Sequence, residues 1–211
     1  MKTNNQFISY RLIIVLFVAA GIMTSCIDDD VEAPAPINEV ETFTDITLVF
    51  TNANDPSDVV TALATDPDGE GIQELTISDE IVLSSTTQYI LTFNIFNNLE
   101  NPGVDIGAEI LEEDDEHQFF YSFTENAFSN PTGNGNIDMA NDELNYEDLD
   151  DNNLPVGLET AWTTDTAITG GMFRVRLQHQ PAVNGNLVKT ATSTSNSGDT
   201  DFDLTFTLNI Q

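Results

Sequence analysis

Basic side chains are scarce in this sequence. Its 211 residues contain five Lys and Arg against 36 Asp and Glu, which gives a net charge of −31. A chain this acidic repels phosphate backbones and anionic headgroups, so nucleic acid is excluded as a natural partner. Cations, glycans, small ligands and other proteins remain as candidate partners.

Cysteine and long apolar runs are also nearly absent. Cys26 is the single cysteine, so the chain has no internal disulfide. The apolar run at residues 12–23 is 12 residues long, whereas a membrane span needs about 20. Because Lys2 and Arg11 precede this run, the pattern predicts a secretory signal peptide over residues 1–25.

The residues that follow the apolar run suggest what becomes of the cysteine. Met23-Thr24-Ser25-Cys26 resembles the lipobox of bacterial lipoproteins. The resemblance implies cleavage before Cys26 and attachment of lipid to it, which would hold the protein to a membrane. Cleavage would remove two bases and no acid, so the net charge would move from −31 to −33.

An acidic, proline-containing stretch separates Cys26 from the rest of the chain. Residues 27–40 read IDDDVEAPAPINEV, a composition that cannot build a core and is typical of a semi-extended tether. Asp28 to Asp30 also resemble the surface-export signal of Bacteroidota lipoproteins. We therefore expect a tether over residues 26–40 and a single domain over residues 41–211.

The domain sequence is rich in short runs with alternating apolar residues. In residues 201–211, every second residue is apolar and these residues share one face, as in a strand whose other face is exposed to solvent. They are Phe202, Leu204, Phe206, Leu208 and Ile210. Similar runs, separated by turn residues, occupy 43–51, 59–65, 75–83, 88–97, 118–124, 143–149, 156–163 and 172–180. The pattern predicts an all-β fold, an antiparallel sandwich of about nine strands, with a lipocalin-like barrel as the alternative.

One segment departs from the alternation of strands. Residues 104–116 (VDIGAEILEEDDE) place Ile106 and Ile110 four apart, which predicts a short helix that Asp105 could cap. Its acidic end requires some compensation, because the helix dipole disfavours negative charge there. A cation, an arginine or solvent could supply it.

The same segment leads into EEDDEHQFFY, residues 112–121, where Glu113 and His117 are four residues apart. A carboxylate and an imidazole at helical spacing could share a metal ion, and Glu113, Glu116 and His117 could support a carboxylate-based hydrolase. The simpler interpretation is a joint between helix and strand, with the acids in solvent and the aromatic residues in the core.

Two Asp-rich turns resemble calcium loops. Asp148, Asp150, Asn152 and Glu159 occupy positions 1, 3, 5 and 12 of the pattern, although Asn153 replaces its glycine. The second turn is formed by Asp66, Asp68 and Glu70. Hairpin turns use the same residues for backbone reasons, so both interpretations stay open. We expect no other cofactor.

Arg174 and Arg176 fall on the wet face of the strand at residues 172–180. We expect this strand to pair antiparallel with residues 201–210, so that Asp201 and Asp203 form an ion-pair ladder with the arginines. Glu113, His117, Arg174 and Arg176 are the candidates for a ligand-binding face. His179 and Trp162 are expected to be buried.

The sequence contains no P-loop, no GxSxG, no HExxH and no CxxC motif, which disfavours the commoner enzyme classes. Through SCIDDD, EEDDEHQFFYSF and LQHQP, the chain resembles a group of small flavobacterial outer-membrane lipoproteins of the Bacteroidota. The resemblance implies a lipid-anchored position in the outer membrane, at the cell surface or else facing the periplasm, and supplies no catalytic residues. We therefore expect a non-enzymatic binding or interaction module, with a structural envelope protein whose turns bind calcium as the alternative.

Overall fold

The computed structural model describes residues 41–69 and 75–211, which belong to one compact unit, Asn38–Gln211. The expected signal peptide, Cys26, the tether and Glu70 lie outside the described residues. Within them, no helix is both long enough and apolar enough to cross a membrane.

The larger of two sheets has seven strands. These are β1 (Asp45–Asn52), β2 (Val59–Thr65), β3 (Thr76–Ile77), β5 (Gln88–Asn97), β6 (Val104–Asp105), β8 (Phe128–Asn130) and β9 (Thr160–Thr164). Their order is β3-β2-β1-β5-β9-β8, and β6 also pairs with β5. All of these pairs are antiparallel.

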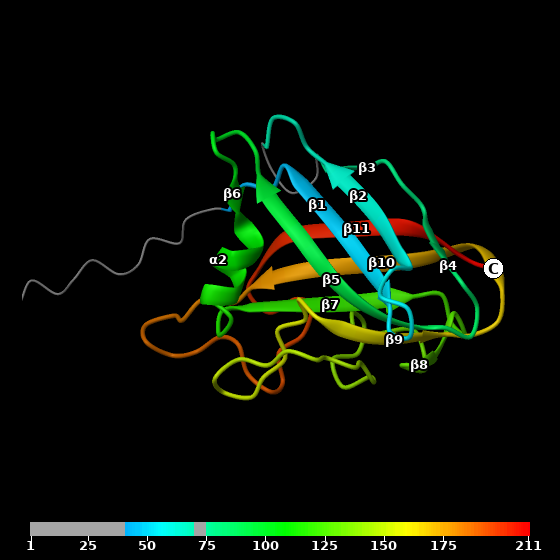
Figure 1. Ribbon diagram of the computed structural model, residues 1–211. Helices are drawn as coiled ribbons and strands as arrows, with labels where there is room; N and C mark the ends of the chain where they lie inside the picture. Colours follow the sequence, from blue (N-terminus) through cyan, green and yellow to red (C-terminus); the bar gives the residue numbers. More distant parts are fainter. Residues whose placement is uncertain (1–40, 70–74) are drawn as a thin grey trace, which may run out of the picture. The chain divides into compact units, whose positions relative to one another are not determined.

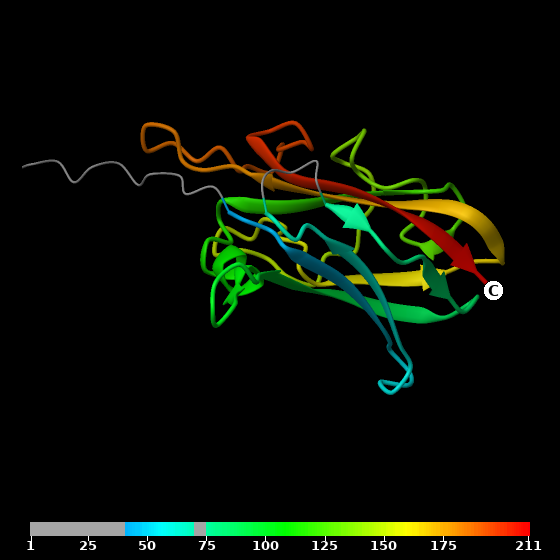
Figure 2. The same ribbon diagram turned by 90° about the horizontal axis from the view of Figure 1, so that it is seen from above.

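The smaller sheet has four strands: β4 (Ile81–Leu83), β7 (His117–Phe123), β10 (Ile168–His179) and β11 (Asp199–Ile210). Their order is β4-β11-β10-β7. The short β4 runs parallel to β11, and the other pairs are antiparallel. Figure 2 shows the two sheets as separate layers, with β10 and β11 in one and β5 and β9 in the other. The predicted all-β sandwich is confirmed.

Alternating residues of the two sheets fill the space between them. On β11 the five predicted apolar residues are all buried, as are the inward residues of β10, Phe173, Val175 and Leu177. Trp162 of β9 is 1% exposed and packs edge-on against Phe173, with 5.1 Å between ring centroids. Burial of these apolar side chains, worth about 1.5–3 kcal/mol each, is the main force that holds the layers together.

The single described helix, α2 (Ile106–Glu112), lies beside β5 at one end of the sheets (Figure 1). Asp105 caps it as predicted, because its carboxylate accepts the N–H of Ala108 at 3.1 Å. Ile106 and Ile110, four residues apart, are both buried. The helix therefore ends next to the start of β7, where the candidate site lies.

Three predicted strands differ from the structure. Residues 75–83 form two short strands, β3 and β4, which belong to different sheets. Residues 143–149 make only isolated bridges at Tyr146 and Leu149, because the Asp148 turn interrupts the pairing. The strand expected at 156–163 begins only at Thr160. The sequence did not predict β6 or β8, which have two and three residues.

Candidate metal centre

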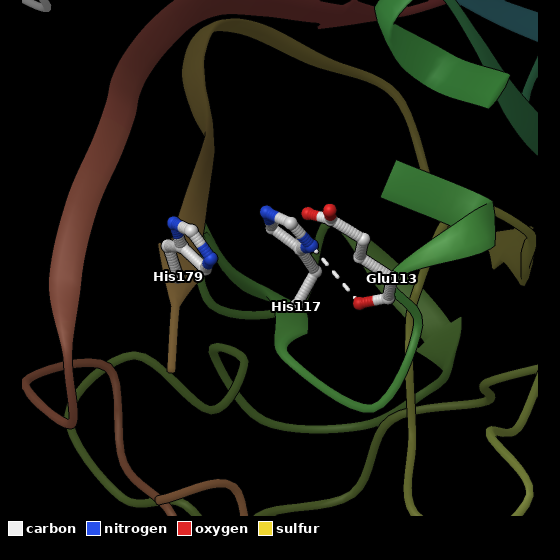
Figure 3. Close-up of side chains that lie close together, drawn as sticks. All are labelled: Glu113, His117 and His179. Atoms are coloured by element: carbon white, nitrogen blue, oxygen red, sulfur yellow. Dashed lines mark hydrogen bonds between the residues drawn. The ribbon is translucent and has the colours of Figure 1, made fainter. Parts of the chain in front are cut away.

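Two histidines meet where β7 begins and β10 ends. His117 pairs directly with His179 in the antiparallel ladder, next to the inward pair Phe119 and Leu177. Because both histidines share the inward phase, their rings lie side by side, 4.4 Å apart and within 13° of parallel. Figure 3 shows this stack with Glu113 on the far side of His117. Both histidines are buried, at 0% and 5% exposure.

The nearby helix end determines the orientation of the His117 ring. Its Nδ1 lies 3.1 Å from the main-chain oxygen of Glu113, the contact drawn in Figure 3. A carbonyl oxygen can only accept, so Nδ1–H is the donor and the lone pair of the neutral ring is on Nε2. Histidines that bind metals commonly donate their second N–H to a backbone carbonyl in this way.

Two carboxylates face the Nε2 atom of His117. Glu41 Oε1 lies 3.1 Å away and Asp201 Oδ2 lies 3.9 Å away. The shorter contact is an ion pair when the imidazole is protonated, and His117 Nε2, Glu41 Oε2 and Asp201 Oδ2 are buried polar atoms with no hydrogen-bond partner. Buried polar atoms are nearly always paired, and unpaired ones cost about 1–3 kcal/mol each. This cluster of three requires an explanation.

A β-bulge brings Asp201 to this position. The ladder passes from the pair Leu177–Phe202 to the pair Gln178–Thr200, so Asp201 has no opposite partner on β10. The expected ladder is therefore correct for Asp203, which pairs with both arginines, and wrong for Asp201. The bulge moves Asp201 out of the alternation and toward His117.

The electrostatics of the cluster favour a positive charge. Burial lowers the pKa of His117, but the adjacent Glu41 carboxylate more than offsets this, and the net pKa is raised. Burial and the charge of Glu41 raise the pKa of Asp201 to about 7. The basic side chains of the described residues pair elsewhere, the arginines with Asp203 and Lys189 with Asp150. Among the described residues, the cation that faces these acids is His117 when it is protonated, and a metal ion on its Nε2 would have to replace that proton.

Two three-residue groups in the described part of the chain could hold a metal ion: Glu41–His117–Asp201 and Glu113–His117–His179, each with ligand atoms within 4.8 Å of one another. The second group is less suitable. The nitrogen lone pairs of an imidazole lie in the plane of its ring. Because the two rings are stacked in nearly parallel planes, one ion cannot lie in the plane of both. Glu113 is also exposed, and its main-chain oxygen already binds Nδ1. His179 instead contacts Glu116, with Nε2 3.5 Å from Oε2.

Lys189 supplies the compensation expected at the acidic helix end. Its ammonium group donates to the main-chain oxygen of Asp114 at 2.6 Å and lies 2.9 Å from Asp150 Oδ2. The side chains of Lys189 and Asp150 are fully buried. Burial lowers the pKa of Lys189, partly offset by Asp150. This ion pair connects the loop after β10 to the turn at Asp150.

The candidate calcium turns direct their carboxylates at backbone N–H groups. Asp148 accepts from Gly157 and Glu159. Asp150 accepts from Asn152 and Leu154, both at 2.8 Å, in addition to its contact with Lys189. In the other turn, Asp66 accepts from Asp68 and Gly69. Both oxygens of Asp148 and of Asp150 therefore have structural partners already, whereas the two N–H groups at Asp66 both contact its Oδ1. Calcium binding stays a prediction.

The expected ligand face is divided between two surfaces. Arg174 and Arg176 lie on the outward phase of β10, and both donate to Asp203 through paired contacts. Arg176 also donates to Ser195 O at 3.0 Å. His117 lies at the end of the inward face and Glu113 at the exposed end of α2, so the structure does not bring the four residues together.

Sequence reasoning identified His117 but missed its partners. Glu41, 76 positions earlier in the numbering, has no local motif, and the bulge at Asp201 has no local signature. The one available signal was that His179 ends an inward-facing run. Comparison of the chain with models of protein families, with curated proteins and with solved structures found no match. The fold and the cluster therefore define only the structural class of this protein, which is a β-sandwich with a buried histidine–carboxylate cluster.

Proposed function

We propose that this protein is a lipid-anchored binding module of the bacterial cell envelope whose ligand is a divalent transition metal ion. The observation that carries the metal is the fully buried Nε2 of His117, without a hydrogen-bond partner and facing Glu41 and Asp201. The envelope location is supported by the signal-like run at residues 12–23 and by Cys26.

Zinc suits this donor set best. One imidazole and two carboxylates are typical zinc ligands, whereas calcium takes oxygen donors only. With bonds of about 2.0–2.1 Å, tetrahedral ligand atoms lie about 3.4 Å apart. The distances of 3.1 and 3.9 Å from His117 Nε2 to the two carboxylates bracket that value. His179 keeps the ring of His117 in place by stacking, and is a positioning residue.

Zinc titration of the purified, metal-stripped protein tests the proposal. We expect one zinc per chain by calorimetry, with an increase in melting temperature because zinc binds the folded state. His117→Ala should weaken binding by about 100-fold or more, since it removes the nitrogen ligand.

A matched pair of variants on β11 controls for net charge. Asp201→Asn removes a proposed ligand and should weaken zinc binding, whereas Asp203→Asn removes the same charge on the outward face and should not. Wild-type protein that takes up no zinc, or His117→Ala protein that binds it equally well, would refute the metal centre. Resistance of the protein to protease on intact cells, lost on lysis, would contradict an outward-facing location.

A further inference from the structure

The proposed metal centre includes the first residue that the structure describes. Glu41 begins the leading segment, defined here as residues 41–44, which precedes β1. The other ligands, His117 and Asp201, lie on β7 and β11 of the opposite sheet. An ion bound by all three residues would therefore connect the chain that enters the domain to the smaller sheet.

The second half of the leading segment is fixed without any ion. Phe43 is buried and packs edge-on against Phe202, with 5.3 Å between ring centroids. Thr44 donates its N–H to Phe96 O at 2.9 Å, and its hydroxyl accepts from Asn98 N at 2.8 Å. These contacts hold the chain from Phe43 onward, so within the described residues any metal-dependent change is confined to Glu41 and Thr42.

Glu41 is held differently. Its side chain is 9% exposed, and His117 is its one ion-pair partner among the described residues. The second carboxylate, Asp201, lies against the same imidazole, so two like charges meet in a place from which water is largely excluded. Such an arrangement is repulsive when both acids are ionised and becomes attractive when a divalent ion lies between them.

We infer that metal binding fastens the leading segment to β7 and β11 and that loss of the metal releases it. This inference rests on the proposed function and assigns a role to the same site. The ion would fix the direction in which residues 41 and 42 lead into β1.

Hydrogen exchange measured by mass spectrometry on the whole protein tests the inference. In saturating zinc, the amide of Thr42 should exchange about tenfold more slowly than in chelator, because its local opening then requires loss of a metal ligand. Amides in the middle of β5, far along the chain from the centre, should not change. Zinc binding is measured by calorimetry on the same samples.

Two variants distinguish fastening from binding. Glu41→Gln should still bind zinc through His117 and Asp201, more weakly, but should show no zinc-dependent protection at Thr42 even at saturation. Asp201→Asn should weaken zinc binding to a similar extent and keep the protection, because Glu41 and His117 remain connected.

The outcomes separate the two proposals. Zinc binding without protection in the wild type, or equal protection in Glu41→Gln at saturation, would overturn the fastening role and leave the metal centre intact. Absence of zinc binding in the wild type would overturn the metal centre itself. Protection that is lost in Glu41→Gln and retained in Asp201→Asn supports the inference.

Discussion

Asp203, on the outer face of the smaller sheet, is a carboxylate that pairs with two arginines. Arg174 and Arg176 both donate to it, and its side chain is 24% exposed. Burial raises the pKa of Asp203, but the two arginines more than offset that effect, and the net pKa is lowered. The same carboxylate therefore favours the folded state only when it is ionised.

The direction of the pH dependence follows from this shift. A carboxyl whose pKa is lowered by folding contributes stability above its unfolded value of about 4, and loses it as the pH falls through the folded value. We expect wild type to exceed Asp203→Asn by about 1 kcal/mol in urea unfolding between pH 5 and 8, since the pair is partly exposed. The difference should shrink below pH 4. Glu125→Gln, at an exposed position, is the control; a difference that persists unchanged at pH 2 would contradict the ion pair.

At the scale of elements, the end of β10 depends on a close backbone approach. Gly198, just before β11, has φ +78°, and a Cβ there would overlap the carbonyl oxygen of His179. Since His179 stacks on His117, the approach also helps to shape the proposed metal centre. Gly185 has a similar φ of +75° but open space around it, so it provides a matched control.

We expect Gly185→Ala to lower the free energy of unfolding by about 1 kcal/mol, because alanine disfavours the left-handed conformation. Gly198→Ala should lower the free energy of unfolding by about 2 kcal/mol or more, because the end of β10 must also move. The displacement should reduce zinc affinity only in Gly198→Ala. Urea unfolding and zinc calorimetry on both variants measure these effects, and equal zinc affinity in the two would show that the approach is not needed by the centre.

Strong alternation made some elements predictable. The bounds of β2 and β5 agree with the sequence pattern to the residue, and β11 was clear from five alternating apolar side chains. Residues 143–149 alternate only at Leu144 and Tyr146, and Asp148 and Asp150 direct their carboxylates at N–H groups, which favours turns over a ladder. Local hydrogen bonding of that kind is invisible to periodicity.

At the scale of the whole molecule, the candidate site depends on contacts between distant segments. The joint at residues 112–121 was predicted, and so was the interest of His117. Glu41 and Asp201 reach it only because β1, β7 and β11 converge at one end of the sandwich, and because one bulge turns Asp201 inward. Register and bulges are set by pairing across the sheet, so this part of the site could not be read from spacing.

The net charge of −31 also acts on the whole molecule. Repulsion among the acids disfavours the compact state, and salt screens it over about 10 Å at 0.1 M. We expect the free energy of unfolding to rise by about 1 kcal/mol when sodium chloride is raised from low concentration to 0.2 M. Calcium chloride at equal ionic strength, with the proposed metal centre saturated with zinc beforehand, separates screening from specific binding. Because Asp148 and Asp150 already accept backbone N–H groups, calcium should add nothing beyond sodium. A larger effect of calcium that Asp150→Asn abolishes would instead establish the calcium turns.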